Sequence, residues 1–344
     1  MDSSTQRLAE RSLVCVPEFV YALEGLGPLG RARAQFARTS FGALPSGNWA
    51  PTYIYSHTLA ETSPFQNDGL LGLARSNDRD QAAPSPGLPV ASGQIVVPVD
   101  YNHVGAWLTK LMGAAVDTGS GDPYTHVFTS GAEVLPISAM EIAVKNVGGA
   151  TKYMQYMGII ANKGTIEISR AAGYQKMTID AMFRSEGTSA SSAGGTPAAA
   201  WAREPVAATL GVMNIGGSLA ANILKMNLTM DNKVTAQAFL NGTAYPSGFD
   251  LDDEMAVTGT IDVRFLTSTM YDHAVNGDIL DLTMAFNVGQ THSLAFDMAT
   301  CRLERTGVPI TGPGGIQQTF NFRAEQTNSA AQLVATLKSL VASY

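Results

Sequence analysis

The chain has little charge, almost no cysteine and no long apolar run. Only 15% of its 344 residues are charged, and two are cysteine, Cys15 and Cys301. Two thiols are too few for a disulfide framework, so we interpret both as small buried apolar residues. No stretch of about 18 apolar residues could span a membrane, and the polar start Met1–Glu10 lacks a secretory signal pattern. These absences predict a soluble protein made in a reducing compartment.

Basic side chains are also scarce. The 22 Lys and Arg residues face 29 Asp and Glu residues, which gives a net charge of −7. Residues 1–184 contribute −1 and residues 185–344 contribute −6. Nucleic-acid binding needs a basic stripe that neutralises phosphates, and neither half offers one. Low charge together with 34 glycines is typical of a turn-rich β protein, or of a surface covered by other subunits.

Motifs of catalysis and of metal or cofactor binding are missing as well. The G-x-G-x-x-G pattern at Gly25–Gly30 lacks the strand and helix that a dinucleotide site requires, so we interpret it as a flexible connection. The acidic run Asp250–Glu254 lacks the spaced ligands and central glycine of a calcium loop, and fits a solvated hairpin tip. We therefore predict no catalytic, cofactor or metal site, and no enzyme. The scattered histidines, interpreted as strand or interface residues and not as ligands, are His57, His103, His126, His273 and His292.

What the sequence does contain is alternation of apolar and polar residues, which is typical of half-buried strands. One helix is expected over residues 104–111, capped by Asp100 or Asn102 and ending at Gly113. A second short helical turn around residues 270–274 ends at Gly277. Residues 60–90 form a long polar loop, a kind of segment that is usually functional or disordered. Strands are expected at residues 53–59, 95–99, 125–128, 140–144, 158–160, 165–169, 177–183, 223–230, 261–265, 280–286, 294–298, 318–322 and 332–338.

The chain also repeats itself. The strand "SGQIVVPV" at Ser92–Val99 resembles "TGTIDVRF" at Thr258–Phe265, and a helical segment ending at Gly113 or Gly277 follows each. Matching order over several anchors is the signature of an internal repeat. The other matched features are residues 140–142 with 296–298, 158–160 with 307–309, 162–164 with 312–315, 177–183 with 332–338, and the preceding strands 53–59 with 223–230.

The repeat predicts the organisation of the chain. We expect an N-terminal arm at residues 1–30, a first β domain at 31–184, a linker or loop at 185–204 and a second β domain at 205–344. The expected fold class is mainly β, with two tandem sandwich- or barrel-forming domains, each with one short flanking helix. Two similar domains with open sheet edges favour head-to-tail contacts between chains, which close into rings or continue as filaments.

Several stretches resemble the major tail tube proteins of long-tailed, non-contractile bacteriophages, in particular the prophage-type tube family. The most telling is "ASGQIVVPVDYNHVGAWLTKLMGA" followed by "DPYTHVFTSGAEVLPISAMEIAV", within Ala91–Val144. "GVPITGPGGIQQTFNF" at Gly307–Phe322 and "RTSFGALP" at Arg38–Pro45 agree as well. The resemblance covers residues 31–344, and the arm at residues 1–30 departs from it.

The resemblance implies a structural virion protein with two tail-tube-like domains, whose strands join those of neighbours into a continuous β-barrel. Single-domain relatives form hexameric rings, so three two-domain chains would make a trimeric, pseudo-sixfold ring. Rings would stack into the tail tube in the host cytoplasm, with the loops at residues 60–90 and 231–255 reaching a neighbour. Double-stranded DNA would pass through without specific binding, and an acidic wall would repel it.

The partners implied are further copies of the chain, the tape measure protein, the tail terminator and the distal tail protein, with no membrane involved. Two other functions remain open at this point. One is a different tail component, such as a terminator or the inner tube of a contractile system. The other is a β-sandwich binding module.

Overall fold

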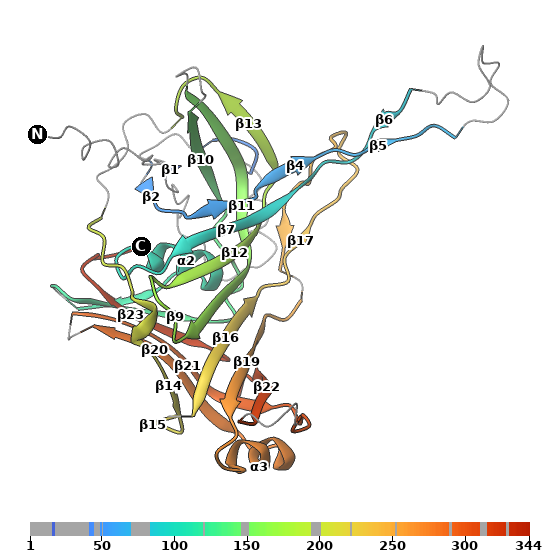
Figure 1. Ribbon diagram of the computed structural model, residues 1–344. Helices are drawn as coiled ribbons and strands as arrows, with labels where there is room; N and C mark the ends of the chain where they lie inside the picture. Colours follow the sequence, from blue (N-terminus) through green and yellow to red (C-terminus); the bar gives the residue numbers. More distant parts are fainter. Residues whose placement is uncertain are drawn as a thin grey trace, which may run out of the picture.

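The computed structural model confirms a mainly β fold built around one large antiparallel sheet (Figure 1). Two helices lie among the residues that the structure describes. The described residues are 16–17, 41–44, 49, 51–69, 83–119, 121–145, 151–193, 201–220, 222–251, 253–288, 291–309, 315–327 and 330–344.

The elements follow one another along the chain in nearly the predicted places. The first half contains β1 (Val16–Pro17), β2 (Pro51–Thr52), β3 (Ser56–His57), β4 (Ala60–Thr62), β5 (Phe65–Gln66), β6 (Ser85–Pro86), β7 (Val90–Pro98), α2 (Val104–Met112), β8 (Val116–Thr118), β9 (Tyr124–Thr129), β10 (Ser138–Lys145), β11 (Thr151–Ser169), β12 (Lys176–Met182) and β13 (Ser185–Ser189). The second half contains the 3-10 turn Ala208–Leu210, β14 (Gly211–Ile215), β15 (Ser218–Leu219), β16 (Ile223–Asp231), β17 (Thr235–Ala236), β18 (Phe249–Asp250), β19 (Ala256–Arg264), α3 (Thr269–Asn276), β20 (Leu280–Val288), β21 (His292–Leu303), β22 (Gln317–Ala324) and β23 (Val334–Ser339).

The central part of the sheet is one run of antiparallel strands, which we call the main layer. Its order is β3 and β4 on the first edge, then β7, β12, the second half of β11, β16, β19 and β22. The first half of β11 leaves this layer and pairs with β10 and β13. A second run of antiparallel strands has the order β14, β20, β21, β23, β9 and β8. One apolar cluster, drawn from both halves, fills the core.

Alternation along the strands explains which face is buried. In β16, Met226, Leu228 and Met230 are fully buried, whereas the residues between them are partly exposed. Val257 and Ile261 of β19 point into the same core. Because successive side chains of a strand point to opposite faces, one face of the main layer is apolar and the other is left to polar residues.

The two helices lie where the sequence predicts, but the predicted cap of α2 is wrong: its N-cap is His103, and no side chain caps the helix by a hydrogen bond. The Asp100 carbonyl accepts the N–H groups of His103 and Val104, and the Asp100 carboxylate accepts the N–H of Asn102. α3 ends at Gly277, whose φ of 67° lies in the left-handed region that favours glycine.

The structure differs from the sequence predictions at several strands. Part of the predicted linker is a strand, since Ser185–Ser189 pairs with Tyr153–Met157 of β11. Backbone hydrogen bonds to β11 stabilise this strand. Its small polar side chains show no apolar alternation, so the sequence does not predict it. The strands predicted at 158–160 and 165–169 form one element, β11, with a register shift after Ala161. Only two residues of the predicted strand 53–59 are in β3.

The predicted loop at residues 60–90 is largely a hairpin in its described part. β4 and β5 run out from the body and β6 and β7 return, so the hairpin projects at the upper right of Figure 1, whereas α3 lies at the bottom. Of the predicted arm, only Val16–Pro17 is described, and it pairs with β2.

Candidate assembly surface

One face of the main layer is polar from edge to edge, and we call it the polar face. Residues directly opposite each other on neighbouring strands share a face, so the ladders allow its rows to be followed across strands. One such row crosses the whole layer and carries mostly hydroxyl side chains. Its members are Ser56, Val96, Thr178, Thr165, Thr229, Thr258 and Arg323.

Charges of both signs lie side by side on the polar face. The Lys163 Nζ is 3.2 Å from the Asp231 carboxylate, and the Lys225 Nζ is 2.7 Å from the Glu167 carboxylate. The hydrogen bond to Glu167 raises the pKa of Lys225. The polar face therefore carries similar numbers of acidic and basic side chains. The other charged members are Lys176, Asp180, Asp262, Arg264 and Arg323.

The two halves of the chain meet where β11 pairs with β16. The ladder joins Lys163–Ser169 to Lys225–Asp231. Beyond its end, the Asn232 side-chain amide donates to the carbonyls of Leu111 and Ala161 at 3.0 and 3.2 Å. We call this contact the internal junction.

Side chains from the connection after β16 complete the internal junction. The Asn162 side-chain oxygen accepts the N–H of Val234 at 2.8 Å. The Val234 side chain is buried against Leu135 and Ile160 of the first half. Both polar and apolar contacts thus hold the second half in one position on the first.

Both halves pair their strands in the same order. The first half runs β3 and β4, β7, β12, β11, β10, and the second runs β16, β19, β22, β21, β20. In addition, β13 pairs with β11 as β23 pairs with β21. This order aligns β10 with β20 and β12 with β22. Two of the matches predicted from the sequence are therefore wrong by one strand, namely residues 140–142 with 296–298 and residues 177–183 with 332–338.

The register agrees with the repeat of Ser92–Val99 in Thr258–Phe265. Gly93 of β7 lies opposite Ala181 of β12, and Gly259 of β19 lies opposite Phe322 of β22. The equivalent positions therefore fall at the same place in the two ladders.

Both glycines are required by the same close approach of a neighbouring strand. A β carbon at Gly93 would lie 2.5 Å from the carbonyl oxygen of Thr58, and one at Gly259 would lie 2.0 Å from that of Asn227. Real β carbons essentially never approach another atom within 3.0 Å. Thr58, which lies between β3 and β4, is equivalent to Asn227 of β16, so the repeated glycine has a physical cause.

Register shifts mark equivalent points in the last strands too. In the first half, the shift in the ladder between β10 and β11 follows the pair Ser138 and Ile159. In the second half, the shift between β20 and β21 follows Leu280 and Cys301. Ile159 thus corresponds to Cys301, and the same correspondence continues along β11 and β21.

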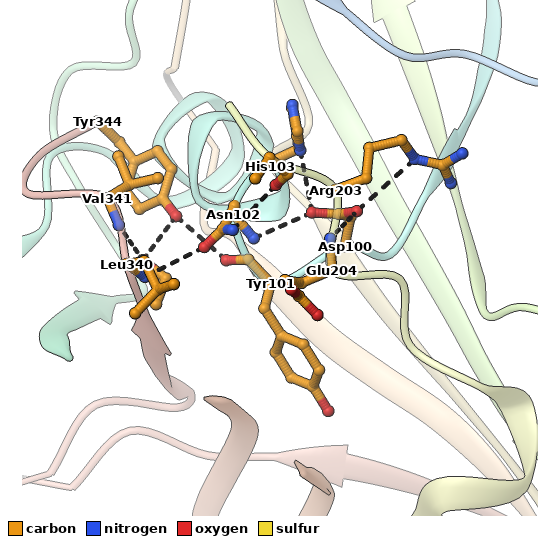
Figure 2. A network of polar contacts seen from close by, with 11 residues as sticks. Asp100, Tyr101, Asn102, His103, Arg203, Glu204, Leu340, Val341 and Tyr344 are labelled. Atoms are coloured by element: carbon orange, nitrogen blue, oxygen red, sulfur yellow. Dashed lines mark hydrogen bonds and ion pairs between the residues drawn. The ribbon is translucent and has the colours of Figure 1, made fainter. Parts of the chain in front are cut away.

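A buried carboxylate ties the chain together at the start of α2 (Figure 2). Asp100 is fully buried and accepts the N–H of Asn102 at 3.0 Å and of Glu204 at 2.8 Å. Its Oδ1 lies 2.9 Å from His103 Nδ1, and the Arg203 Nε is 3.9 Å from Oδ2. A buried charge needs such partners, so this carboxylate holds the end of the predicted linker against the helix.

The end of the chain joins the same network. The Asn102 side-chain oxygen accepts the N–H of Leu340 at 3.1 Å, and its amide donates to the Ala202 carbonyl at 2.9 Å. The Tyr344 hydroxyl donates to the Tyr101 carbonyl at 3.1 Å (Figure 2). The network is structural, since it consists of contacts among linker, helix and C-terminus.

The histidines do not come together. Among the residues that the structure describes, no group of three or more His, Cys, Asp or Glu residues could hold a metal ion. Burial lowers the pKa of His57, whose ring packs on Tyr156. The contacts of the other four are His103 with Asp100, His126 with Asp117 and the Val341 carbonyl, His273 with Asp278, and His292 with Thr291.

The other sequence candidates are structural or fall outside the described residues. Asp250 begins the acidic run at the end of β18 and accepts the Gln237 side-chain amide, and Asp253 lies 3.0 Å from the Lys233 Nζ. Cys15 and the pattern Gly25–Gly30 lie outside the described residues. In the described part of the chain, neither helix is long and apolar enough to cross a membrane.

The chain matches the family model described as phage tail tube protein over residues 36–324. It belongs to this family. The match spans most of the chain and includes the main layer and the internal junction. Membership implies a structural component of the virion tail that self-assembles into a tube. No curated protein matches the chain.

Proposed function

We propose that the chain polymerises into stacked rings that form the tail tube of a long-tailed, non-contractile phage, the channel for DNA ejection. The observation that supports this most is the shared pairing order of the two halves, joined through β11 and β16. A contact that joins two similar units within a chain can be repeated between chains. Head-to-tail repetition then closes a ring if the rotation allows it.

We propose a domain duplication, with an arm at residues 1–30, tube domains at 31–184 and 205–344, and the connection at 185–204 between them. Six domains per ring then require three chains, which gives a homotrimer with approximate sixfold symmetry. Closure of the main layers of three chains would form one β-barrel, and a barrel leaves no free edge.

In this arrangement the polar face lines the channel. Phosphate binding draws on unpaired cations that release counterions from DNA. On the polar face the amines of Lys163 and Lys225 are instead neutralised by neighbouring carboxylates. A wall of hydroxyl groups, with carboxylates interspersed among its cations, suits DNA that must slide past without specific binding.

The projecting hairpins suit contacts between rings or neighbours. Phe65 and Leu88 on the hairpin from β4 to β7 are 72% and 71% exposed, an unusual place for large apolar side chains. The hairpin from β16 to β19 lies beside it, since the Tyr245 hydroxyl donates to Glu61 at 3.2 Å. The tape measure protein inside the tube, and the terminator and distal tail protein at its ends, complete the proposed set of partners.

Negative-stain electron microscopy of the purified chain and of the virion tests this function. Regular stacked rings are the expected result, and a dispersed monomer with no tube in the virion would contradict it. Copy number separates the main tube protein from a terminator, because the tube needs many copies per particle and a terminator few.

A further inference from the structure

The first edge of the main layer lacks a neighbour that its counterpart possesses. β3 and β4 pair with β7 on one side, and with no other strand in the described part of the chain. Their counterpart β16 pairs with β19 on one side and with β11 on the other. His57 and Met226, which face the equivalent residues Ile95 and Ile261, fix the alignment of the two strands.

The other edge of the layer shows the complementary difference. β11 continues to Ser169, between β12 and β16, whereas its counterpart β21 ends at Leu303. Residues 304–309 still run along β22: the Glu304 N–H donates to the Asn321 carbonyl at 2.8 Å, and the Gln318 side-chain amide donates to the carbonyls of Thr306 and Gly307. This segment occupies the place of the pairing part of β11, and no strand of the described part of the chain pairs with its outer side.

We propose that residues 304–309 pair with β3 and β4 of a second copy of this chain, in the register of the internal junction. The proposal rests on the proposed function and names its contact within the ring. The correspondence of Ile159 with Cys301 makes Gly307 the counterpart of Thr165. The alignment of His57 with Met226 makes Ala60 the counterpart of Thr229.

The register follows from these counterparts. Since Thr165 lies opposite Thr229 in the internal junction, Gly307 lies opposite Ala60 of the second copy. One residue further, Val308 lies opposite Leu59, as Ile166 lies opposite Leu228. The apolar pair falls on the core side and the small pair on the polar face, so the proposed ladder continues both faces of the layer.

The hydrogen-bonding groups of the free edge agree with this register. The Thr58 N–H donates inward to the Gln94 carbonyl at 2.8 Å. Because the direction of the backbone groups alternates along a strand, the N–H and C=O of Leu59 point away from β7, whereas those of Thr58 and Ala60 point toward it. Pro309, which lacks an N–H, then falls opposite Thr58, at a position where the ladder needs no donor. The outward Glu61 N–H is occupied by the Glu186 carboxylate at 3.0 Å, so the new ladder starts at Ala60.

A cross-strand disulfide tests the register directly. A pair that exchanges no hydrogen bonds brings its Cα atoms to about 4.5 Å, within the range that a disulfide spans. The variant Ala60→Cys with Gly307→Cys therefore places two thiols across the proposed contact. Ala60 is exposed, and a β carbon at Gly307 meets nothing within 4 Å.

The two native cysteines must not react in this experiment. Cys15→Ser is introduced throughout, and Cys301 is retained because it is fully buried. Burial raises the pKa of the Cys301 thiol to about 12, which keeps it protonated and unreactive.

Mild oxidation of assembled tubes should convert most of the Ala60→Cys, Gly307→Cys chain to covalent dimers and trimers on a non-reducing gel. The internal counterpart, Thr165→Cys with Thr229→Cys, should oxidise within one chain and stay at monomer size. Ala60→Cys with Val308→Cys is the register control, since its thiols lie on opposite faces and should give little product.

Electron microscopy of the same samples separates the two possible failures. Tubes without covalent product, or equal product from the register control, would overturn the proposed pairing while leaving the tube function intact. Absence of tubes from the unsubstituted chain would count against the function itself. If the double variant does not fold, mixed assembly of the two single variants should yield covalent dimers that neither yields alone, and their absence from mixed tubes would overturn the pairing.

Discussion

The two halves pair their strands alike but are covered to very different extents. All nine residues of α2 are buried, whereas only Met270 and Ala274 of the eight in α3 are. α2 lies under the C-terminal segment, where the ring of Tyr344 packs on Gly105. The helix of the first half is thus covered by the rest of the chain, and the helix of the second half is largely exposed.

Exposed apolar residues around α3 fit this difference. Leu266 before the helix, Val275 within it and Ile279 after it are all exposed. Such residues scattered singly need no explanation, but three at one end of the molecule indicate a contact surface. Exposed apolar side chains around α3 are consistent with a chain that assembles with further copies of itself.

Truncation in the two helices should give the largest contrast. Leu108→Ala removes a fully buried side chain of α2 and should lower the free energy of unfolding by about 4 kcal/mol. Val275→Ala in α3 should change it by less than about 0.5 kcal/mol, because the side chain is largely exposed. Urea denaturation of the unassembled chain measures both. Equal losses would contradict the difference in coverage.

Substitution of the repeated glycines by alanine should destabilise the chain in both halves, with the larger loss in the second half. Gly259→Ala places a β carbon 2.0 Å from the Asn227 carbonyl and against the Phe322 ring, which should destabilise the chain by about 3 kcal/mol. Gly93→Ala should cost less, because β3 and β4 lie at an edge and can shift. Thermal denaturation compares them with Gly121→Ala, which meets nothing within 4 Å. A neutral Gly259→Ala would disprove the shared close approach.

Loss of the Asp100 network should destabilise the chain, whereas a substitution at the equivalent position of the second half should not. Asp100→Ala leaves the buried N–H of Asn102 and the N–H of Glu204 without this acceptor and should lower the free energy of unfolding by about 2 kcal/mol. The equivalent position after β19 is the exposed Leu266, and Leu266→Ala should leave the unassembled chain almost unchanged. Chemical denaturation of the two variants tests this, and an unaffected Asp100→Ala protein would count against the anchoring role.

The ion pairs on the polar face should have the smallest effect. Lys225→Ala breaks a pair that is partly exposed on both sides, so the loss of stability should be below about 0.5 kcal/mol. The same variant leaves Glu167 unpaired and makes the face more acidic. Assembly yield and the melting temperature should both stay close to those of the parent chain. A loss as large as that of Gly259→Ala would show that the pair holds the internal junction.

Local pattern was enough to predict most of the fold. Period-two alternation identified nearly every long strand, and Gly113 and Gly277 marked the helix ends. Gly93 and Gly259 exposed the repeat because a close backbone approach excludes every other residue there. These constraints act within a strand or on its neighbour, so they leave a trace in the sequence.

The assembly surface could not be predicted to the same degree. The local sequence of Lys163–Ser169 does not predict its pairing with Lys225–Asp231, because this pairing depends on the packing of distant segments. Alternation identifies two faces per strand without saying which is polar across the layer. The strand Ser185–Ser189 was missed because its small residues carry no apolar signal.

The number of chains per ring tests the central claim most directly. Cryo-electron microscopy of the assembled tube should show three chains in each ring, with six similar strand groups around one channel. The junction inside each chain and the junction between chains should superimpose. A ring of six whole chains, or two junctions with unrelated strand pairing, would contradict the account.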